Sequence, residues 1–226
     1  MSKSPESSRN ATYAYVAPFV AFVGLMALLP YLKVPTEIAY TVRIAVVSAL
    51  VLFLSRPYLT WRFTSPFASI VIGAVVFAIW VGPDVLFDYR QHWLFNNSVT
   101  GSVKSSIAVE LRQQAWFVML RSFGATILVP IVEELFWRGW LMRWLIKTDF
   151  LKVPLGQYDT SAFWIVAALF ASEHGPYWEV GLITGVIYNW WMIRTKSLAD
   201  CILMHAVTNG ILCAYVVMSG KWEYLF

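Results

Sequence analysis

Two adjacent carboxylates and an arginine lie inside an otherwise apolar, aromatic stretch of the chain. Glu134 and Arg138 are four residues apart, so on a helix they share one face and can form an ion pair. That pair offsets part of the cost of burying its charges. Glu133 is rotated by about 100° from Glu134 and is left without a cation of its own. A carboxylate of this kind can accept a proton from water near neutral pH and act as a general base.

Two histidines follow on later apolar segments. His174 ends one such segment, and His205 lies four residues before Asn209, so those two side chains share a helix face. Imidazole exchanges protons near neutral pH, and His and Asn side chains can donate hydrogen bonds to a developing oxyanion. The third histidine, His92, lies among aromatic residues and is interpreted as structural. Glu173 would point away from His174 on a helix, so it is only a supporting candidate.

The composition requires a membrane protein. Of 226 residues, 59% are hydrophobic and 13% are charged, and the mean hydropathy is +0.62. Soluble domains carry about 25% charged residues. A spanning helix needs about 20 mainly apolar residues, so six to eight spans use up nearly the whole chain. The net charge of +4 does not suggest a nucleic-acid surface. The expected fold is an all-α polytopic membrane protein with about seven transmembrane helices and a single membrane domain.

Apolar runs separated by Pro, Gly and charged residues give the expected spans and their orientation. The spans are predicted at 13–32, 36–54, 66–82, 113–146, 160–174, 177–193 and 198–219. Lys and Arg are more numerous in the loops on the N-terminal side of the membrane, which predicts a cytoplasmic N-terminus. We expect residues 1–110 to form N-terminal helices with an interfacial segment, and residues 111–226 to form the functional core.

The predicted depths of the polar residues conflict with one another. Hydropathy places Glu133 and His205 in the cytoplasmic half of the membrane and His174 at the far end of the fifth span. Either the fifth helix begins deep in the cytoplasm, or it stops within the bilayer at Gly175-Pro176, where irregular backbone is tolerated if it lines a cavity. Pro130, one turn before Glu133, should kink the fourth span.

The order of these motifs resembles one protein family. Over roughly residues 115–215 the chain is similar to the CPBP (ABI) family, which includes the CAAX prenyl endopeptidases and bacteriocin-processing proteins. The motifs that carry the resemblance are Glu133-Glu134-x-x-x-Arg138, Phe170-x-x-x-His174 and His205-x-x-x-Asn209. Each motif is weak alone, whereas all three in this order within a polytopic protein are specific. The first hundred residues carry no signal of the family.

The resemblance implies an intramembrane glutamate-dependent endopeptidase, a hydrolase. Glu133 and His174 would bind and activate water, while His205 and Asn209 would stabilise the oxyanion. The supporting residues would be Glu134, Arg138 and Phe170. No cofactor is expected. The substrate would be a membrane-anchored or lipidated protein, including CAAX-like proteins, cleaved at the lipid bilayer. The protein is expected to lie in a bacterial inner (plasma) membrane. It is not expected to bind nucleic acid.

Three other hypotheses remain open on the residues alone. In a zinc protease, Glu133, His174 and His205 would be the ligands, a His₂Glu set with an open position. A non-catalytic membrane scaffold or immunity protein would not need the carboxylate of Glu133. A transporter with a buried carboxylate is disfavoured because no inverted repeat is visible. Activity in the presence of a chelator would exclude the zinc protease.

Overall fold

The computed structural model describes residues 5–105 and 107–225, and the regular structure within them is helical. The α-helices are α1 (Pro5–Tyr31), α2 (Thr36–Leu50), α3 (Pro66–Phe87), α4 (Val109–Arg112), α5 (Ala115–Phe123), α6 (Val129–Glu134), α7 (Met142–Trp144), α8 (Thr160–Ser172), α9 (Trp178–Thr195) and α10 (Leu198–Ser219). The π-helical stretches are Val51–Ser55, Gly124–Leu128 and Leu135–Leu141. The 3₁₀ turns are Arg56–Tyr58, Tyr89–Gln91, Phe150–Lys152, Gly175–Tyr177 and Trp222–Tyr224.

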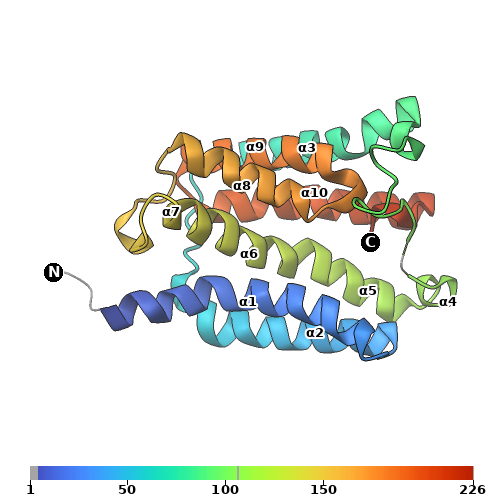
Figure 1. Ribbon diagram of the computed structural model, residues 1–226, viewed down its shortest axis with the longest axis horizontal. Helices are drawn as coiled ribbons and strands as arrows, with labels where there is room; N and C mark the ends of the chain where they lie inside the picture. The colour runs from blue at the N-terminus through green and yellow to red at the C-terminus, as the bar shows by residue number, and fades with distance from the viewer. Residues whose placement is uncertain (1–4, 106, 226) are drawn as a thin grey trace.

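The helices form a bundle divided by one long central helix. Figure 1 shows α1 and α2 side by side along one edge, with α5, α6 and α7 running end to end across the middle. On the other side lie α3, α8, α9 and α10. The closest neighbours across the bundle are α3 with α10, α8 with α9, and α1 with α2. The central helix therefore contacts both groups.

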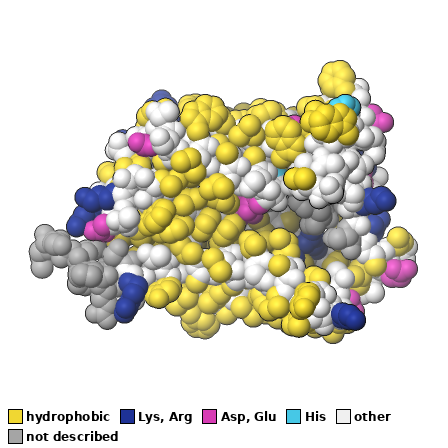
Figure 2. Space-filling model, in the orientation of Figure 1, with side chains coloured by type: hydrophobic (Ala, Val, Ile, Leu, Met, Phe, Trp, Pro, Cys, Tyr) yellow, Lys and Arg dark blue, Asp and Glu magenta, His cyan; other side chains and the backbone are white. Residues whose placement is uncertain are grey.

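Within the described residues, five helices are long and apolar enough to cross a membrane. They are Arg9–Tyr31, Thr36–Tyr58, Pro66–Phe87, Ala115–Trp144 and Leu198–Ser219, and α8 is a shorter apolar helix. In Figure 2 hydrophobic side chains cover the middle of the visible face, while charged side chains gather toward its two ends. This distribution matches a protein surrounded by lipid chains along its middle. The predicted all-α integral membrane fold is confirmed.

The third span differs from its prediction. It was expected to end at residue 82, before Pro83, but α3 continues through this proline to Phe87. Proline removes one backbone hydrogen bond, which membrane helices tolerate because local adjustments satisfy the freed groups. The helix ends instead where Asp88 adopts a left-handed conformation with φ of 47° and donates its N–H to the Asp84 carbonyl.

The central helix is irregular at the two places that flank the paired carboxylates. Residues Gly124–Leu128 are π-helical just before Pro130, and Leu135–Leu141 are π-helical just after Glu134. Proline lacks the N–H that a regular α-helix would use, which favours a local change of hydrogen bonding. Single π-helical turns inside α-helices are often found at functional sites.

Candidate active site

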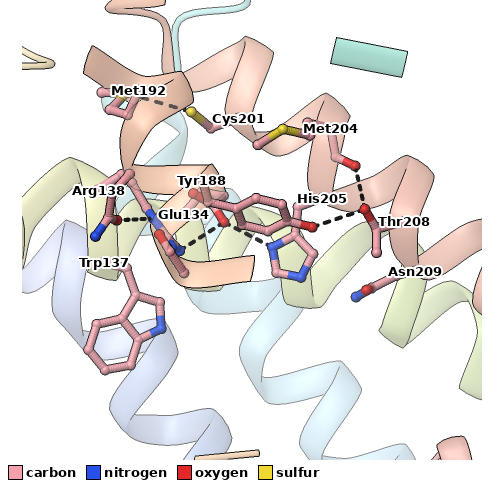
Figure 3. Close-up of polar contacts among 12 residues, drawn as sticks. Glu134, Trp137, Arg138, Tyr188, Met192, Cys201, Met204, His205, Thr208 and Asn209 are labelled. Carbon is pink, nitrogen blue, oxygen red and sulfur yellow. Dashed lines mark hydrogen bonds and ion pairs between the residues drawn. The ribbon is translucent and has the colours of Figure 1, made fainter. Parts of the chain in front are cut away.

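Glu134 is the centre of a buried polar cluster that joins three helices. Its Oε1 atom lies 3.2 Å from Arg138 Nη1 and 2.9 Å from His205 Nδ1 (Figure 3). Glu134 and Arg138 are both 0% exposed, and His205 is 5% exposed. The ion pair expected from the four-residue spacing is therefore present in the interior. A buried carboxylate and guanidinium require partners of this kind, because neither can reach water.

The remaining donors of Arg138 reach α9. Its Nε atom donates to Oδ1 of Asn189 at 3.0 Å, and its Nη2 atom donates to the Gly185 carbonyl at 3.4 Å. Its guanidinium carbon lies 4.6 Å from the ring centre of Phe170 and 5.3 Å from that of Tyr188. Arg138 is thus held on several sides, so this cluster fixes α8, α9 and α10 against the central helix.

Glu133 lies beside this cluster but is not part of its hydrogen bonding. Its Oε2 atom is buried and has no hydrogen-bond partner among the described residues. The adjacent Glu134, by contrast, is satisfied at Oε1 by both Arg138 and His205. The two neighbouring carboxylates differ at Oε1, because Glu134 Oε1 binds Arg138 and His205, whereas Oε2 of each is buried without a hydrogen-bond partner among the described residues.

His174 lies in the turn between α8 and α9. Helix α8 ends at Ser172, and Gly175 adopts φ of 51°, so the predicted break at Gly175-Pro176 is confirmed. His174 Nδ1 lies 2.6 Å from the Phe170 carbonyl oxygen. Because a carbonyl only accepts, Nδ1 carries the proton, and Nε2 of the neutral ring has a free lone pair. The turn thus presents a potential base.

The ring of Phe170 links the two histidines. It lies 4.6 Å from the His174 ring and 6.3 Å from the His205 ring, measured between centroids. The His174 ring also contacts Trp80 of α3 at 5.3 Å. A Cβ at Gly181 would lie 3.2 Å from that of His174, so a glycine there leaves room for α9 beside the turn. These contacts bring His174 to the same region as the Glu134 cluster.

A direct contact also connects the central helix to this turn. Trp137, one helical turn after Glu133, donates its Nε1–H to Glu173 Oε1 at 3.0 Å. Glu173 was expected to point away from the site, and the structure corrects this because α8 has already ended there. The early ending of α8 agrees with the helix break that was expected at Gly175-Pro176.

Asn209 follows His205 by one turn on α10. Its Nδ2 atom donates to the Ala125 carbonyl at 2.9 Å, within the first π-helical stretch of the central helix. An Asn amide has two N–H groups, so one remains for another acceptor. Figure 3 shows Asn209 and His205 on the same side of α10. Their common face, expected from the spacing, is turned toward the central helix.

A second buried arginine holds the His174 turn from the opposite side. Arg90 donates to the Pro176 carbonyl at 2.8 Å, and its guanidinium lies 2.9 Å from Glu179 Oε1 and 3.4 Å from Asp84 Oδ2. It also lies 4.0 Å above the ring of Tyr177. This cluster attaches the segment after α3 to the beginning of α9. Sequence reasoning missed it, because no motif surrounds Arg90.

A cavity of about 150 Å³ opens beside the same turn. Its lining includes Glu173 and Gly175, the residues on either side of His174, together with Lys104 from the segment before α4. This volume accommodates several water molecules. Water can therefore reach the turn that carries His174.

The described residues contain no group of three or more His, Cys, Asp or Glu side chains placed to hold a metal ion. Glu133, His174 and His205, the set that a zinc protease would need, do not form such a group. In this arrangement both histidines use Nδ1 for other partners, namely Phe170 and Glu134.

Residues 113–211 match the model of one protein family, described as type II CAAX prenyl endopeptidase Rce1-like. The matched range contains all three motifs, and it confirms the predicted resemblance over this part of the chain. The helices are those of an integral membrane protein, and residues 113–211 are similar to a family of CAAX-type prenyl endopeptidases. No curated protein and no solved structure matched the chain.

Proposed function

We propose that this protein is an intramembrane glutamate-dependent endopeptidase that cleaves a membrane-anchored or lipidated, CAAX-like protein. The observation that carries the proposal is the contrast between the two neighbouring carboxylates. Glu134 is engaged by Arg138 and His205, whereas Glu133 Oε2 is buried without a partner among the described residues. An unpaired buried carboxylate is costly to maintain in a membrane protein, which is typical of a functional group.

In the proposed reaction, Glu133 and His174 position a water molecule and Glu133 accepts one of its protons. The water oxygen forms a bond to the carbonyl carbon of the scissile peptide, and the carbonyl electrons move to its oxygen. When the tetrahedral intermediate collapses, the C–N bond breaks and the leaving nitrogen takes the proton from Glu133. The products are a carboxylic acid and an amine, which become a carboxylate and an ammonium group when the acid passes its proton to the amine, so atoms and protons balance without a redox partner.

The oxyanion would be stabilised by His205 and by the second N–H of Asn209. Because His205 already uses Nδ1 toward Glu134, it donates from Nε2 only when the ring carries both protons. Glu134 lies where it would offset that positive charge. We therefore assign Glu134 and Arg138 a supporting role, and Phe170 the role of holding the His174 ring in place.

We further propose that the protein uses no metal. We also propose that it lies in a bacterial inner membrane with its N-terminus on the cytoplasmic side. The orientation is supported by the excess of Lys and Arg in the loops on that side. Cleavage would take place close to the membrane end of the substrate. The partners are thus the lipid bilayer and a membrane-bound protein.

The test is cleavage of a panel of membrane-anchored and lipidated peptides by purified protein, with products identified by mass. The panel includes peptides with a prenylated cysteine near the C-terminus. Glu133→Gln, which keeps the shape of the side chain, should abolish cleavage, and His174→Ala and His205→Ala should each reduce it about 100-fold or more. Glu110→Gln, at an exposed position, is the matched control and should cleave normally. Normal cleavage by folded Glu133→Gln protein would contradict the proposal.

A further inference from the structure

The directions of the helices show at which end of the bundle each loop lies. Helix α1 runs away from the end that carries the N-terminus, α2 returns to it, and α3 runs away again (Figure 1). The central helix returns, α8 runs away, α9 returns, and α10 runs away. The turn between α8 and α9, which carries His174, therefore faces the end opposite to the N-terminus.

Contacts with the loops agree with this position of the turn. The Pro176 carbonyl accepts a hydrogen bond from Arg90, which belongs to the connection between α3 and α4. The Tyr177 hydroxyl donates to the Glu223 carbonyl, which follows α10, at 3.2 Å. Both partners come from segments at the end opposite to the N-terminus. The turn is thus held at that end by two loops that are far apart in the sequence.

The cavity beside the turn opens at the same end. Its lining comes from the turn itself, from the connection between α3 and α4, and from the segment after α10. Within this lining Ser102, Lys104 and Glu173 are exposed, and Glu223 is partly exposed. Charged side chains of membrane proteins face water-filled cavities rather than lipid chains. The cavity is therefore a polar entrance that leads toward His174 from the end opposite to the N-terminus.

The other side of the Glu134 cluster is filled by packed side chains. Met192 in the last turn of α9 and Cys201 in the first turn of α10 are both 0% exposed. Their sulfur atoms lie 3.7 Å apart (Figure 3). A Cβ at Gly156 would lie 2.5 Å from the Met192 carbonyl oxygen, so the loop before α8 lies directly against α9. Close packing of this kind closes the site toward the N-terminal end among the described residues.

The distribution of Lys and Arg relates the two ends of the bundle to the two sides of the membrane. The end with the N-terminus carries Arg9, Arg56, Arg62, Arg143, Lys147, Lys152, Arg194 and Lys196, and the opposite end carries Lys33, Arg90, Lys104, Arg112 and Lys221. Loops that are richer in Lys and Arg remain in the cytoplasm. This rule assigns the end with the cavity to the non-cytoplasmic side.

We propose that the candidate active site is entered from the non-cytoplasmic side of the membrane, through the cavity beside the His174 turn, and that its substrate is an exported, membrane-anchored protein cleaved on that side. This inference rests on the proposed proteolytic function, to which it adds the side of the membrane on which the scissile bond lies. A lipid anchor is compatible with it when the anchored segment has been exported. Proteins whose cleavable segment stays in the cytoplasm are excluded as substrates.

The first arm of the test measures the side of the entrance and needs no cleavage. Ser102→Cys places a thiol in the lining of the cavity, and Gln157→Cys is the matched control at an exposed position of the loop before α8. In spheroplasts, a membrane-impermeant maleimide should label Ser102→Cys, and should label Gln157→Cys only after the membrane is permeabilised. The native Cys201 and Cys213 are buried, so the unmodified protein gives the background. The opposite order of labelling, or equal labelling, would overturn the proposal.

The second arm asks whether the cavity leads to the reacting groups. Purified Ser102→Cys and Gln157→Cys are each modified with a bulky polyethylene-glycol maleimide and assayed on the peptide panel. Modification should abolish cleavage by Ser102→Cys and leave cleavage by Gln157→Cys unchanged. If both modified proteins cleave equally well, the cavity is not the entrance and the assignment is wrong.

The third arm presents one lipid-anchored peptide on either side of the membrane. The orientation of the protein in liposomes is determined by the maleimide labelling, and the peptide is placed in the outer or the inner leaflet. Cleavage should occur only in the leaflet on the side that labels Ser102→Cys. Cleavage only on the other side, or equally on both, would refute the proposed entrance and leave the proteolytic function intact. By contrast, equal cleavage by Glu133→Gln, or no cleavage from either side, would refute the proteolytic function and the proposed substrate with it.

Discussion

Two buried arginines hold the two parts of the candidate active site, and they are neutralised in different ways. Arg138 and Glu134 are 0% exposed and bind partners on α9 and α10, so their cluster joins helices in the interior. The side chains of Arg90, Asp84 and Glu179 are 2%, 13% and 20% exposed, and their cluster joins a loop to a turn. The interior cluster supports the helix that carries Glu133, and the other supports the turn that carries His174.

The two clusters hold Glu133 and His174 through different contacts. In the Glu134 cluster Arg138 forms its ion pair with Glu134, so Glu133 has no cationic partner among the described residues. The Arg90 cluster binds the Pro176 carbonyl and so fixes the backbone two residues after His174. The carboxylate of Glu133 and the imidazole of His174 are therefore positioned by separate sets of contacts. We expect the two sets to respond differently to mutation.

The largest effect is expected for Arg138→Met. Removing this side chain leaves Glu134 as a buried carboxylate without its guanidinium, which should lower the free energy of unfolding by about 3–5 kcal/mol. Thermal unfolding in detergent measures the loss. In a double-mutant cycle, adding Glu134→Leu should recover part of the stability, because no buried charge then remains unpaired. Additive losses would contradict the description of this cluster as one unit.

A smaller effect is expected for Arg90→Met. Its carboxylate partners are partly exposed, so water can replace the guanidinium, and the free energy of unfolding should fall by about 1–3 kcal/mol. Cleavage should nevertheless decrease, because the turn that carries His174 loses its contact at Pro176. The loss of cleavage, relative to the loss in free energy of unfolding, should be larger for Arg90→Met than for the exposed control Arg62→Gln. If Arg90→Met is less stable but cleaves equally well at low temperature, Arg90 does not support the candidate active site.

The smallest effect is expected for Trp137→Phe, which removes the hydrogen bond between the two regions together with part of one buried ring. The ring remains beside Phe170, where the ring centres are 6.2 Å apart, and the bond to Glu173 is lost. Because Glu173 is exposed, the stability should fall by no more than about 0.5–1.5 kcal/mol. Trp116→Phe is the matched control, since it removes an exposed hydrogen bond to Gln114. Identical cleavage by both variants would mean that the Trp137 contact does not couple the regions.

The sequence was sufficient for the parts of the site that follow helical spacing. The ion pair of Glu134 with Arg138 and the common face of His205 and Asn209 both follow from a separation of four residues. The break at Gly175-Pro176 also followed from local residue preferences. These features depend on neighbours in the chain, which is why they could be predicted.

Contacts between distant segments could not be predicted in the same way. Asn189 is a single amide in an apolar helix, and nothing local indicates that it binds Arg138 and the Phe163 carbonyl. Arg90 lies in a polar connection where burial was not expected. The extension of α3 through Pro83 was wrongly excluded, because the rule that proline ends a helix is weaker in a membrane.

Cleavage by metal-depleted protein tests the central claim most directly. Purified protein is treated with a strong chelator, its metal content per chain is measured, and the unmodified protein is compared with Glu133→Gln on the same peptide panel. Our account predicts full cleavage by the unmodified protein with no metal bound, and no cleavage by Glu133→Gln. Loss of cleavage on chelation, restored by one equivalent of zinc, would contradict it and reassign the carboxylate and the histidines as ligands.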